Sequence, residues 1–258
     1  NENEKIDNKG ENQMLLKVVT FNIAHGKGMD GEVNLERQAK LINAYKPDIV
    51  FLQEIDMYTK RAENKNQIRE FSKKVYLPYC SMESNITFEN GYYGDGIISR
   101  FPISFSTNYL MPLTDPKHEQ RGILCNKIIL GTAKINLFSV HLSTYEEERI
   151  LSTKELMKII DKIDDDEIII IGGDFNVGVT RIGKNKYTYE KRSEYEEYNM
   201  IEKSLIKLDN TDDTWFSDLG QGCIDTMFYS KNITLKKFET INSNMTSDHY
   251  AIYAEFNI

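Results

Sequence analysis

Runs of apolar, β-branched residues alternate along the chain with segments in which apolar residues recur every three or four positions. The first pattern is typical of strands and the second of amphipathic helices. Strands are predicted at residues 15–22, 48–54, 79–84, 95–99, 122–130, 133–141, 168–172, 223–229, 234–240 and 249–256. Helices are predicted at residues 33–45, 67–75 and 146–163, and the polar, tyrosine-rich stretch 176–199 is predicted to be a surface loop.

The order of these elements predicts one α/β (α+β) domain with mixed sheets. Strands outnumber helices, residues 122–141 read as a hairpin around Gly131 and Thr132, and helices connect other strands. Hairpins give antiparallel pairs and helical crossovers give parallel pairs, so both are expected. The domain covers residues 15–258. Residues 1–14 are polar and lack periodicity, which predicts a flexible leader.

Composition narrows the class of protein. Of the 258 residues, 40% are hydrophobic, which is typical of a globular chain. No apolar run approaches the roughly 18 residues that a membrane span needs. Cys80, Cys125 and Cys223 show no CxxC spacing, so we expect packing thiols rather than a zinc site or a disulfide framework. The net charge of −8 argues against a tight, non-specific DNA binder but leaves room for a local basic cleft.

The start of the chain bears on its location. It begins at Asn1, and its polar leader fits the stub left after removal of a signal peptide or a lipid-anchor signal, as well as a trimmed chain. We therefore expect a secreted or surface-anchored protein ahead of a cytoplasmic one. Nothing in the sequence resembles an extended self-pairing helix, so we expect a monomer.

Polar side chains recur at or just beyond the ends of the predicted strands. They are Asn22, Glu54, His141, Asp174, Asn176, Asp225, Asp248 and His249. A single carboxylate after a strand is more often a surface residue than a ligand. In layered α/β folds, however, strand ends converge on one rim, where sites are built. The collective placement therefore predicts one catalytic rim.

Several short segments carry a family resemblance. They are TFNI at 20–23, LQE at 52–54, ISRFP at 98–102, HLS at 141–143, GGDFN at 172–176, ID at 224–225 and SDH at 247–249. In this order they resemble the motifs of the endonuclease/exonuclease/phosphatase superfamily, which includes DNase I, abasic-site endonucleases, inositol-polyphosphate 5-phosphatases and sphingomyelinases. The resemblance runs over residues 17–258. It implies a DNase I-like four-layer sandwich of two packed mixed β-sheets flanked by helices.

The resemblance also implies a divalent cation, Mg²⁺ or Mn²⁺. Hard cations prefer oxygen ligands and keep most of their waters, so one or two protein carboxylates suffice. Glu54 is the candidate for the first ligand, with Asn22 beside it and Asp248 as a further candidate. The alternative for Asn22 is an Asx cap of the loop that follows.

The candidate catalytic groups form two pairs. Asp174 and Asn176 straddle Phe175, and period-2 alternation would point them to the same side. A carboxylate can orient or deprotonate a water, and an amide can bind a phosphoryl oxygen or the nucleophile. His249 and Asp225 look like a His–Asp pair, which in the family acts as a base or stabilises the transition state. The sequence leaves open whether Asp174 or His249 removes the proton.

Two further residues are candidates for binding substrate. His141 matches the family histidine that donates to a phosphoryl oxygen as charge builds on it. Arg121 resembles an arginine that contacts the substrate phosphate in some members, with a surface salt bridge as the alternative. Other candidates near the rim, which equally suit solvated loops or core cover, are His25, His118, Tyr92, Tyr93, Trp215 and Phe216.

These inferences together predict a divalent-metal-dependent phosphoesterase that hydrolyses a phosphodiester or a phosphomonoester by metal-assisted attack of water. The alternatives are a nuclease on DNA or RNA, a phospholipid or sphingomyelin phosphodiesterase, a toxin subunit of nuclease type, and a catalytically silent binding module. Net charge does not favour nucleic acid, and Ala24 stands where the DNA-repair branch keeps an acid. No aromatic hairpin of the membrane-inserting type is evident. The chain most resembles compact bacterial metal-dependent hydrolases of the superfamily.

Overall fold

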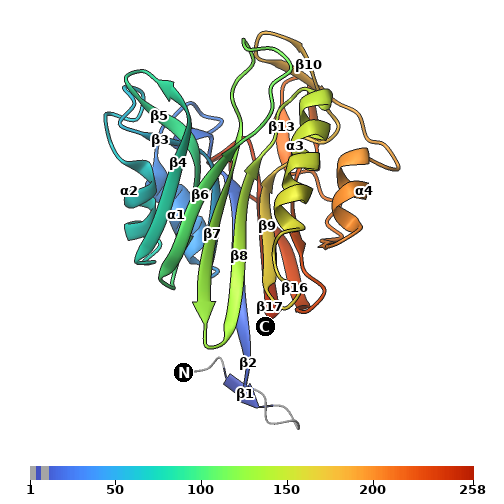
Figure 1. Ribbon diagram of the computed structural model, residues 1–258. Helices are drawn as coiled ribbons and strands as arrows, with labels where there is room; N and C mark the ends of the chain where they lie inside the picture. Colours follow the sequence, from blue (N-terminus) through green and yellow to red (C-terminus); the bar gives the residue numbers. More distant parts are fainter. Residues whose placement is uncertain (1–3, 7–11) are drawn as a thin grey trace.

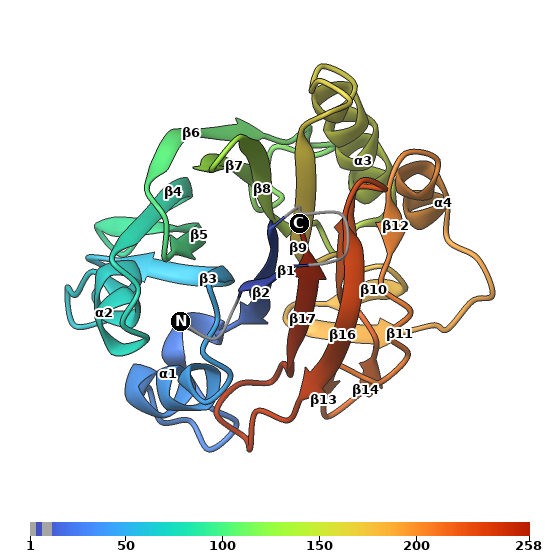
Figure 2. The same ribbon diagram turned by 90° about the horizontal axis from the view of Figure 1, so that it is seen from below.

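Two β-sheets pack face to face in the computed structural model, which describes residues 4–6 and 12–258 (Figures 1 and 2). The strand order of the first sheet is β16-β17-β2-β3-β5-β4, with β1 beside β2. That of the second is β12-β15-β9-β8-β7-β6. β2 and β3 pair in parallel, as do β8 and β9, whereas their other pairings are antiparallel. Both sheets are therefore mixed, as predicted.

The strand bounds fix where each side chain lies. The first sheet contains β1 (Glu4–Ile6), β2 (Asn12–Asn22), β3 (Ile49–Met57), β4 (Tyr79–Phe88), β5 (Gly91–Ser99), β16 (Thr234–Ile241) and β17 (Ala251–Asn257). The second contains β6 (Ile103–Leu110), β7 (Gly122–Leu130), β8 (Ala133–His141), β9 (Ile168–Asp174), β12 (Ile206–Lys207) and β15 (Asp225–Tyr229). Two small hairpins are β10 (Val179–Gly183) with β11 (Lys186–Tyr189), and β13 (Trp215–Ser217) with β14 (Gly220–Gly222).

Helices cover the outer face of each sheet (Figure 2). α1 (Leu35–Asn43) and α2 (Gln67–Lys74) lie on the first sheet, and α3 (Glu146–Ile160) and α4 (Glu196–Glu202) lie on the second. A short 3₁₀ helix, η1 (Ala24–Gly26), follows β2. Asn34 and Asn66 start α1 and α2 by accepting backbone N–H bonds at the N-cap. The predicted four-layer sandwich is confirmed.

The layering follows from the apolar runs in the inner strands. In β9, the side chains of Ile168 and Ile170 pack between the sheets, and those of Ile169 and Ile171 pack against the helices. In β2, Val18 packs between the sheets and Val19 packs on the helical side. Successive side chains point to opposite faces, so a strand covered on both faces needs apolar residues at every position.

The prediction of a surface loop at residues 176–199 was wrong, because this stretch contains β10, β11 and the start of α4. The hairpin is short, and Val179 is its one buried residue. α4 buries its apolar face through Tyr198 and Ile201 within seven residues, which is too short for a periodic signal. β6 was also missed, since none of the eight side chains of this edge strand is fully buried.

Most of the predicted leader falls on residues 1–3 and 7–11, which lie outside the described residues. Within the described part, Glu4–Ile6 pairs antiparallel with the first residues of β2, so β2 begins earlier than predicted. The boundary between leader and domain stays a prediction. No helix within residues 4–6 and 12–258 is long and apolar enough to cross a membrane.

A charged cluster stabilises the end of β9 that lies opposite Asp174. Glu167 accepts bonds from Asn136 Nδ2 at 2.7 Å and Lys127 Nζ at 2.8 Å, and Lys134 Nζ lies 3.3 Å away. The hydrogen bonds from Asn136 and Lys127, with the Lys134 charge, lower the pKa of Glu167 from 4.5 to about 2. This depressed pKa means that the contribution to stability is complete above the ordinary value and is lost as the pH falls toward 2.

We therefore predict that Glu167→Gln lowers the free energy of unfolding by about 1 kcal/mol at pH 7, because the charge that pairs with the two lysines is lost. The loss is modest because the lysine side chains are partly solvated. The difference from wild type should close as the pH falls toward 2. Urea unfolding at several pH values measures both effects. A difference that stays constant at all pH values would show that the charge of Glu167 is not what stabilises this end of β9.

Candidate active site

Strand register brings three of the predicted residues side by side. His141 ends β8 and pairs with Asp174, which ends β9, and Asp174 pairs in turn with Asp225 at the start of β15. The ends of β8 and β9 lie at the upper end of the sandwich in Figure 1, opposite the end of β17. Asn22 reaches the same rim from the first sheet, where it ends β2. The topology therefore brings the strand ends together at one rim, as predicted.

Asn22 joins carboxylates of both sheets. Its Nδ2 donates to Glu54 Oε1 at 3.2 Å and to Asp174 Oδ2 at 3.1 Å. Its Oδ1 accepts from the backbone N–H of Ala24 at 3.0 Å, which is the Asx cap considered as the alternative. Asn22 is buried, so this arrangement fixes the spacing of the Glu54 and Asp174 carboxylates.

A β-bulge places Glu54 at the rim. The pairing of β3 with β5 shifts between Leu52 and Ile55, and Glu54 has a φ of 59°. Strict alternation would direct Glu54 to the helical face that Val50 and Leu52 occupy. The bulge breaks this alternation, and a left-handed non-glycine residue costs on the order of 1 kcal/mol or more. The fold thus carries local strain at the carboxylate that we assign to the metal.

The electrostatics of Glu54 fit a bound cation. Burial and the Asp248 charge raise the pKa of Glu54 above its usual value. No lysine or arginine in the described part of the chain forms an ion pair with Glu54 or Asp248. His249 and Arg121 offset this rise in pKa only in part, and carboxylates without a lysine or arginine ion-pair partner are what Mg²⁺ and Mn²⁺ bind. The residues therefore fit the predicted metal.

His249 and Asp225 form the predicted pair. His249 Nδ1 lies 2.8 Å from Asp225 Oδ2, and His249 Nε2 lies 3.6 Å from Asp174 Oδ2. Burial opposes charge on His249, but Asp225 and Asp174 outweigh it and raise the pKa of His249 well above its usual value. Burial and Asp225 also raise the pKa of Asp174. The Asp225 contact directs Nε2 of His249 toward Asp174.

Arg121 and His141 are in direct contact. Arg121 Nη1 lies 2.9 Å from His141 Nδ1 and 3.1 Å from Nε2, and it also pairs with Glu119 Oε1 at 3.0 Å. Burial, Arg121 and His249 lower the pKa of His141 well below its usual value, so His141 is neutral. His141 Nε2 lies 3.4 Å from Asp174 Oδ2. The arginine thus reaches the rim as predicted and also forms a salt bridge.

Asn176 lies differently from the sequence expectation. It has a φ of 50°, so period-2 alternation does not extend past the end of β9. Its backbone N–H donates to Asp174 Oδ1 at 3.0 Å, and its Nδ2 donates to Leu142 O at 3.0 Å. Asn176 therefore holds the Asp174 carboxylate and the segment after His141, and its role toward substrate stays a prediction.

The other rim candidates separate into several environments. His118 stacks on Tyr145 at a ring distance of 3.6 Å. Trp215 is buried and forms a backbone bridge to His249. Tyr93 is buried beneath Arg121, whereas the side chain of Tyr92 is largely exposed. The aromatic candidates are thus divided between core and surface.

Sequence reasoning missed two buried acids near the rim. Asp95 lies on β5 close to Arg121 and accepts from Asn85 Nδ2 at 3.1 Å, while its Oδ1 has no partner within residues 4–6 and 12–258. Burial raises the pKa of Asp95 to about 8. Glu148 bonds to several loops of the rim. Neither follows a recognisable motif. Asp95 lies among otherwise buried residues of β5, whereas Glu148 directly follows the exposed Glu146 and Glu147.

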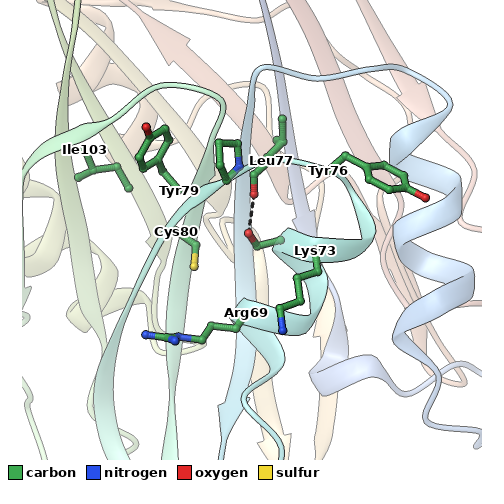
Figure 3. A pocket seen from close by; sticks show the side chains of 9 residues that line it. Arg69, Lys73, Tyr76, Leu77, Tyr79, Cys80 and Ile103 are labelled. Atoms are coloured by element: carbon green, nitrogen blue, oxygen red, sulfur yellow. Dashed lines mark hydrogen bonds between the residues drawn. The ribbon is translucent and has the colours of Figure 1, made fainter.

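A cavity of about 760 Å³ lies elsewhere, beside α2 and β4 (Figure 3). Its lining includes Arg69, Lys73, Tyr76, Tyr79 and Cys80, and it contains none of the predicted site residues. The chemistry is therefore identified by the convergent polar groups at the rim and not by cavity size.

Comparisons with known proteins find related sequences. A sequence profile described as "Endonuclease/Exonuclease/phosphatase family" matches residues 19–249, a range that contains all the motif segments. "Tyrosyl-DNA phosphodiesterase 2" of Mus musculus is 27% identical over 175 residues, which are 65% of this chain and 42% of that protein. The match thus spans less than half the length of that relative.

Solved structures show the same fold. An endonuclease/exonuclease/phosphatase from Beutenbergia cavernae superposes with a TM-score of 0.72 at 18% identity, covering 95% of this chain and 72% of that one. The structure of D. rerio TDP2 "complexed with single strand DNA product" superposes with a TM-score of 0.69 at 19% identity, covering 95% and 99%. At these identities the likeness concerns the fold alone.

Proposed function

The chain belongs to the endonuclease/exonuclease/phosphatase family, and we propose that it hydrolyses phosphate esters with the help of a divalent cation, Mg²⁺ or Mn²⁺. The observation that carries this proposal is the placement of His141, Asp174, Asp225 and His249 on one rim, beside a carboxylate, Glu54, that has no basic ion-pair partner in the described residues. The mouse relative, named as a phosphodiesterase, supports hydrolysis of a phosphoester.

We assign the positioning of the attacking water to Asp174. Its Oδ2 faces Nε2 of both His141 and His249, at 3.4 Å and 3.6 Å. Its Oδ1 accepts the backbone N–H of Asn176, which holds the carboxylate in place. A carboxylate so held can orient a water and accept its proton.

The two histidines have different tasks. Asp225 orients His249 and, with Asp174, raises its pKa, so that Nε2 can stabilise charge at the reacting oxygens. His141 is neutral and lies beside Arg121, so both can donate hydrogen bonds to the phosphoryl oxygens as charge builds on them.

Glu54 is the residue that would hold the cation, with Asp248 and Asn22 beside it. When bound, the cation supplies positive charge that polarises the phosphoryl group and offsets charge on the leaving oxygen. Asn22 keeps the metal-binding carboxylate next to Asp174. The bulge at Glu54 is the structural cost of that placement.

A paired assay tests the reaction. Wild-type protein is incubated with bis(p-nitrophenyl) phosphate or p-nitrophenyl phosphate, with Mg²⁺, with Mn²⁺ or with EDTA. Cation-dependent cleavage of the diester supports a phosphodiesterase, and cleavage of the monoester alone supports a phosphatase. Failure to cleave these esters, nucleic acids, inositol phosphates and phospholipids with either cation would contradict the proposal in favour of a binding module.

A specific observation favours single-stranded nucleic acid as the substrate. Residues 179–192, which form the β10–β11 hairpin and its exit, contain five basic residues and one acid in a chain of net charge −8. The Arg181 guanidinium lies 5.9 Å from the ring centres of both Tyr145 and Tyr187. Basic groups interleaved with aromatic faces bind single strands through phosphate contacts and base stacking. The zebrafish protein solved with single-strand DNA supports this choice.

We predict that Arg181→Ala and Tyr187→Ala raise KM for a single-stranded oligonucleotide about 10-fold each, because each loses one stacking or phosphate contact. Hydrolysis of bis(p-nitrophenyl) phosphate should be unchanged, since this small ester does not reach the hairpin. Steady-state kinetics on both substrates measure the effect. Equal losses of activity on the oligonucleotide and on bis(p-nitrophenyl) phosphate would show that the hairpin does not bind the nucleic-acid strand.

A further inference from the structure

Two neighbouring buried charges in the first turn of α3 bond to several loops of the rim. Glu148 is 1% exposed and Arg149 is 2% exposed. Glu148 Oε1 accepts from Thr114 N at 2.9 Å and from His118 Nδ1 at 2.7 Å, and Oε2 accepts from Ser143 Oγ at 2.7 Å. Glu148 therefore connects the loop before β7 with the loop after β8.

Arg149 connects a further loop. Its Nη1 donates to Ser143 O at 3.3 Å and to Val179 O at 3.2 Å. Its Nε donates at 2.8 Å to Glu197, a buried residue of α4. One guanidinium thus links α3 and α4 to the segments that follow β8 and β9. The planar, fixed arrangement of donors makes arginine suited to such multiple contacts.

The bonded segments are those that bear the candidate substrate-binding residues. Ser143 lies two residues after His141. Val179 donates its N–H to Asn176 O at 3.1 Å. The segment from Thr114 to His118 leads directly into Arg121. The three candidate phosphate-binding residues therefore lie within seven residues of a contact with Glu148 or Arg149. They are His141, Asn176 and Arg121.

The energetics argue against a role in stability alone. Burying charged side chains is costly, and replacing a buried ion pair by apolar residues of similar volume is often neutral or stabilising. A fixed arrangement of charge-assisted bonds to backbone and hydroxyl groups instead defines the relative positions of the loops. Misplacement of a catalytic group by about 1 Å can cost about 10²-fold in rate.

We propose that Glu148 and Arg149 are positioning residues that hold His141, Asn176 and Arg121 in a common arrangement around the substrate phosphate. This inference rests on the proposed phosphoesterase function. Neither side chain contacts the reacting atoms. Both act through the loops that they join.

Arg149→Lys is the first test. A lysine keeps the charge and can reach Glu197, but it lacks the planar fork that bonds Glu197 and the two carbonyls together. We expect kcat on bis(p-nitrophenyl) phosphate to fall about 10-fold or more, with a smaller change in KM. Ser143→Ala, which removes the hydroxyl that donates to Glu148 and accepts from the backbone N–H of Tyr145, should change kcat in the same direction and is the variant to use if Arg149→Lys does not fold.

Glu167→Gln is the matched control, because it disrupts a buried carboxylate network at the opposite end of β9. It should lower stability and leave kcat and KM unchanged. Equal kinetics for Arg149→Lys, Ser143→Ala and wild type, measured well below their melting temperatures, would overturn the proposal.

A second measurement does not depend on turnover. The chain has four histidines, so ¹⁵N-histidine labelling gives a small set of imidazole signals. Arg149→Lys should shift the signals of His141 and His118 and leave that of His25 in place, and Glu167→Gln should shift none of them. If wild type hydrolyses no phosphate ester, the proposed function fails, and these signals alone decide the positioning role: an unshifted His141 signal in folded Arg149→Lys overturns it.

Discussion

His249→Ala is expected to lower kcat for phosphate-ester hydrolysis by about 10²-fold or more while the protein stays folded. His249 Nδ1 lies 2.8 Å from Asp225, and this contact directs Nε2 toward Asp174. The substitution removes the imidazole that stabilises charge at the reacting oxygens. Steady-state kinetics with saturating Mn²⁺ measure the loss.

His249→Asn is the control for structure in this experiment. In wild type, Asp225 Oδ1 has no hydrogen-bond partner among the described residues, and loss of the His249 contact would leave Oδ2 unpaired as well. The asparagine amide can restore a donor to Asp225 but cannot transfer a proton. Both variants should therefore be slow, with His249→Asn the more stable of the two. Turnover close to wild type in either folded variant would remove His249 from the mechanism.

Glu54→Gln is expected to abolish the response to divalent cation. The amide keeps the size of the side chain and loses the charge that would hold Mg²⁺ or Mn²⁺. Activity should fall at least about 10²-fold at a cation concentration that saturates wild type. The metal-free variant should melt at a higher temperature than metal-free wild type, because a partly buried carboxylate without a basic ion-pair partner in the described chain is lost.

Glu155→Gln provides the matched control, because Glu155 forms a solvent-exposed pair with Lys158 on α3. It removes the same charge far from the rim and should change neither the cation response nor the melting temperature appreciably. A Glu54→Gln variant that keeps the cation response of wild type would exclude Glu54 as a ligand.

The sandwich could be predicted wherever a strand is buried on both faces. The unbroken run from Ile168 to Ile171 needs cover on two sides, and the structure provides it. β6 could not be found in the same way, because its exposed edge gives no apolar alternation. α4 is too short for its buried residues, Tyr198 and Ile201, to form a recognisable period.

The residues of the candidate site could be predicted from the sequence, but their arrangement in space could not. Strand ends identified His141, Asp174 and Asp225, but only the register of three paired strands shows that they are neighbours. The bulge at Glu54 depends on pairing with β5, which local sequence does not encode. Glu148 and Arg149 were missed because their partners are distant loops, and a sequence pattern reports spacing along the chain only.

A Mn²⁺ titration of wild type and Glu54→Gln tests whether Glu54 binds a cation that hydrolysis requires. Melting temperature and hydrolysis of bis(p-nitrophenyl) phosphate are both followed. We expect Mn²⁺ to stabilise wild type by about 2.7 kcal/mol at 100 times its Kd and to activate hydrolysis over the same concentration range. Glu54→Gln should show neither effect. Hydrolysis by wild type at the same rate in EDTA as in Mn²⁺, with no shift in melting temperature, would contradict a metal-dependent phosphoesterase.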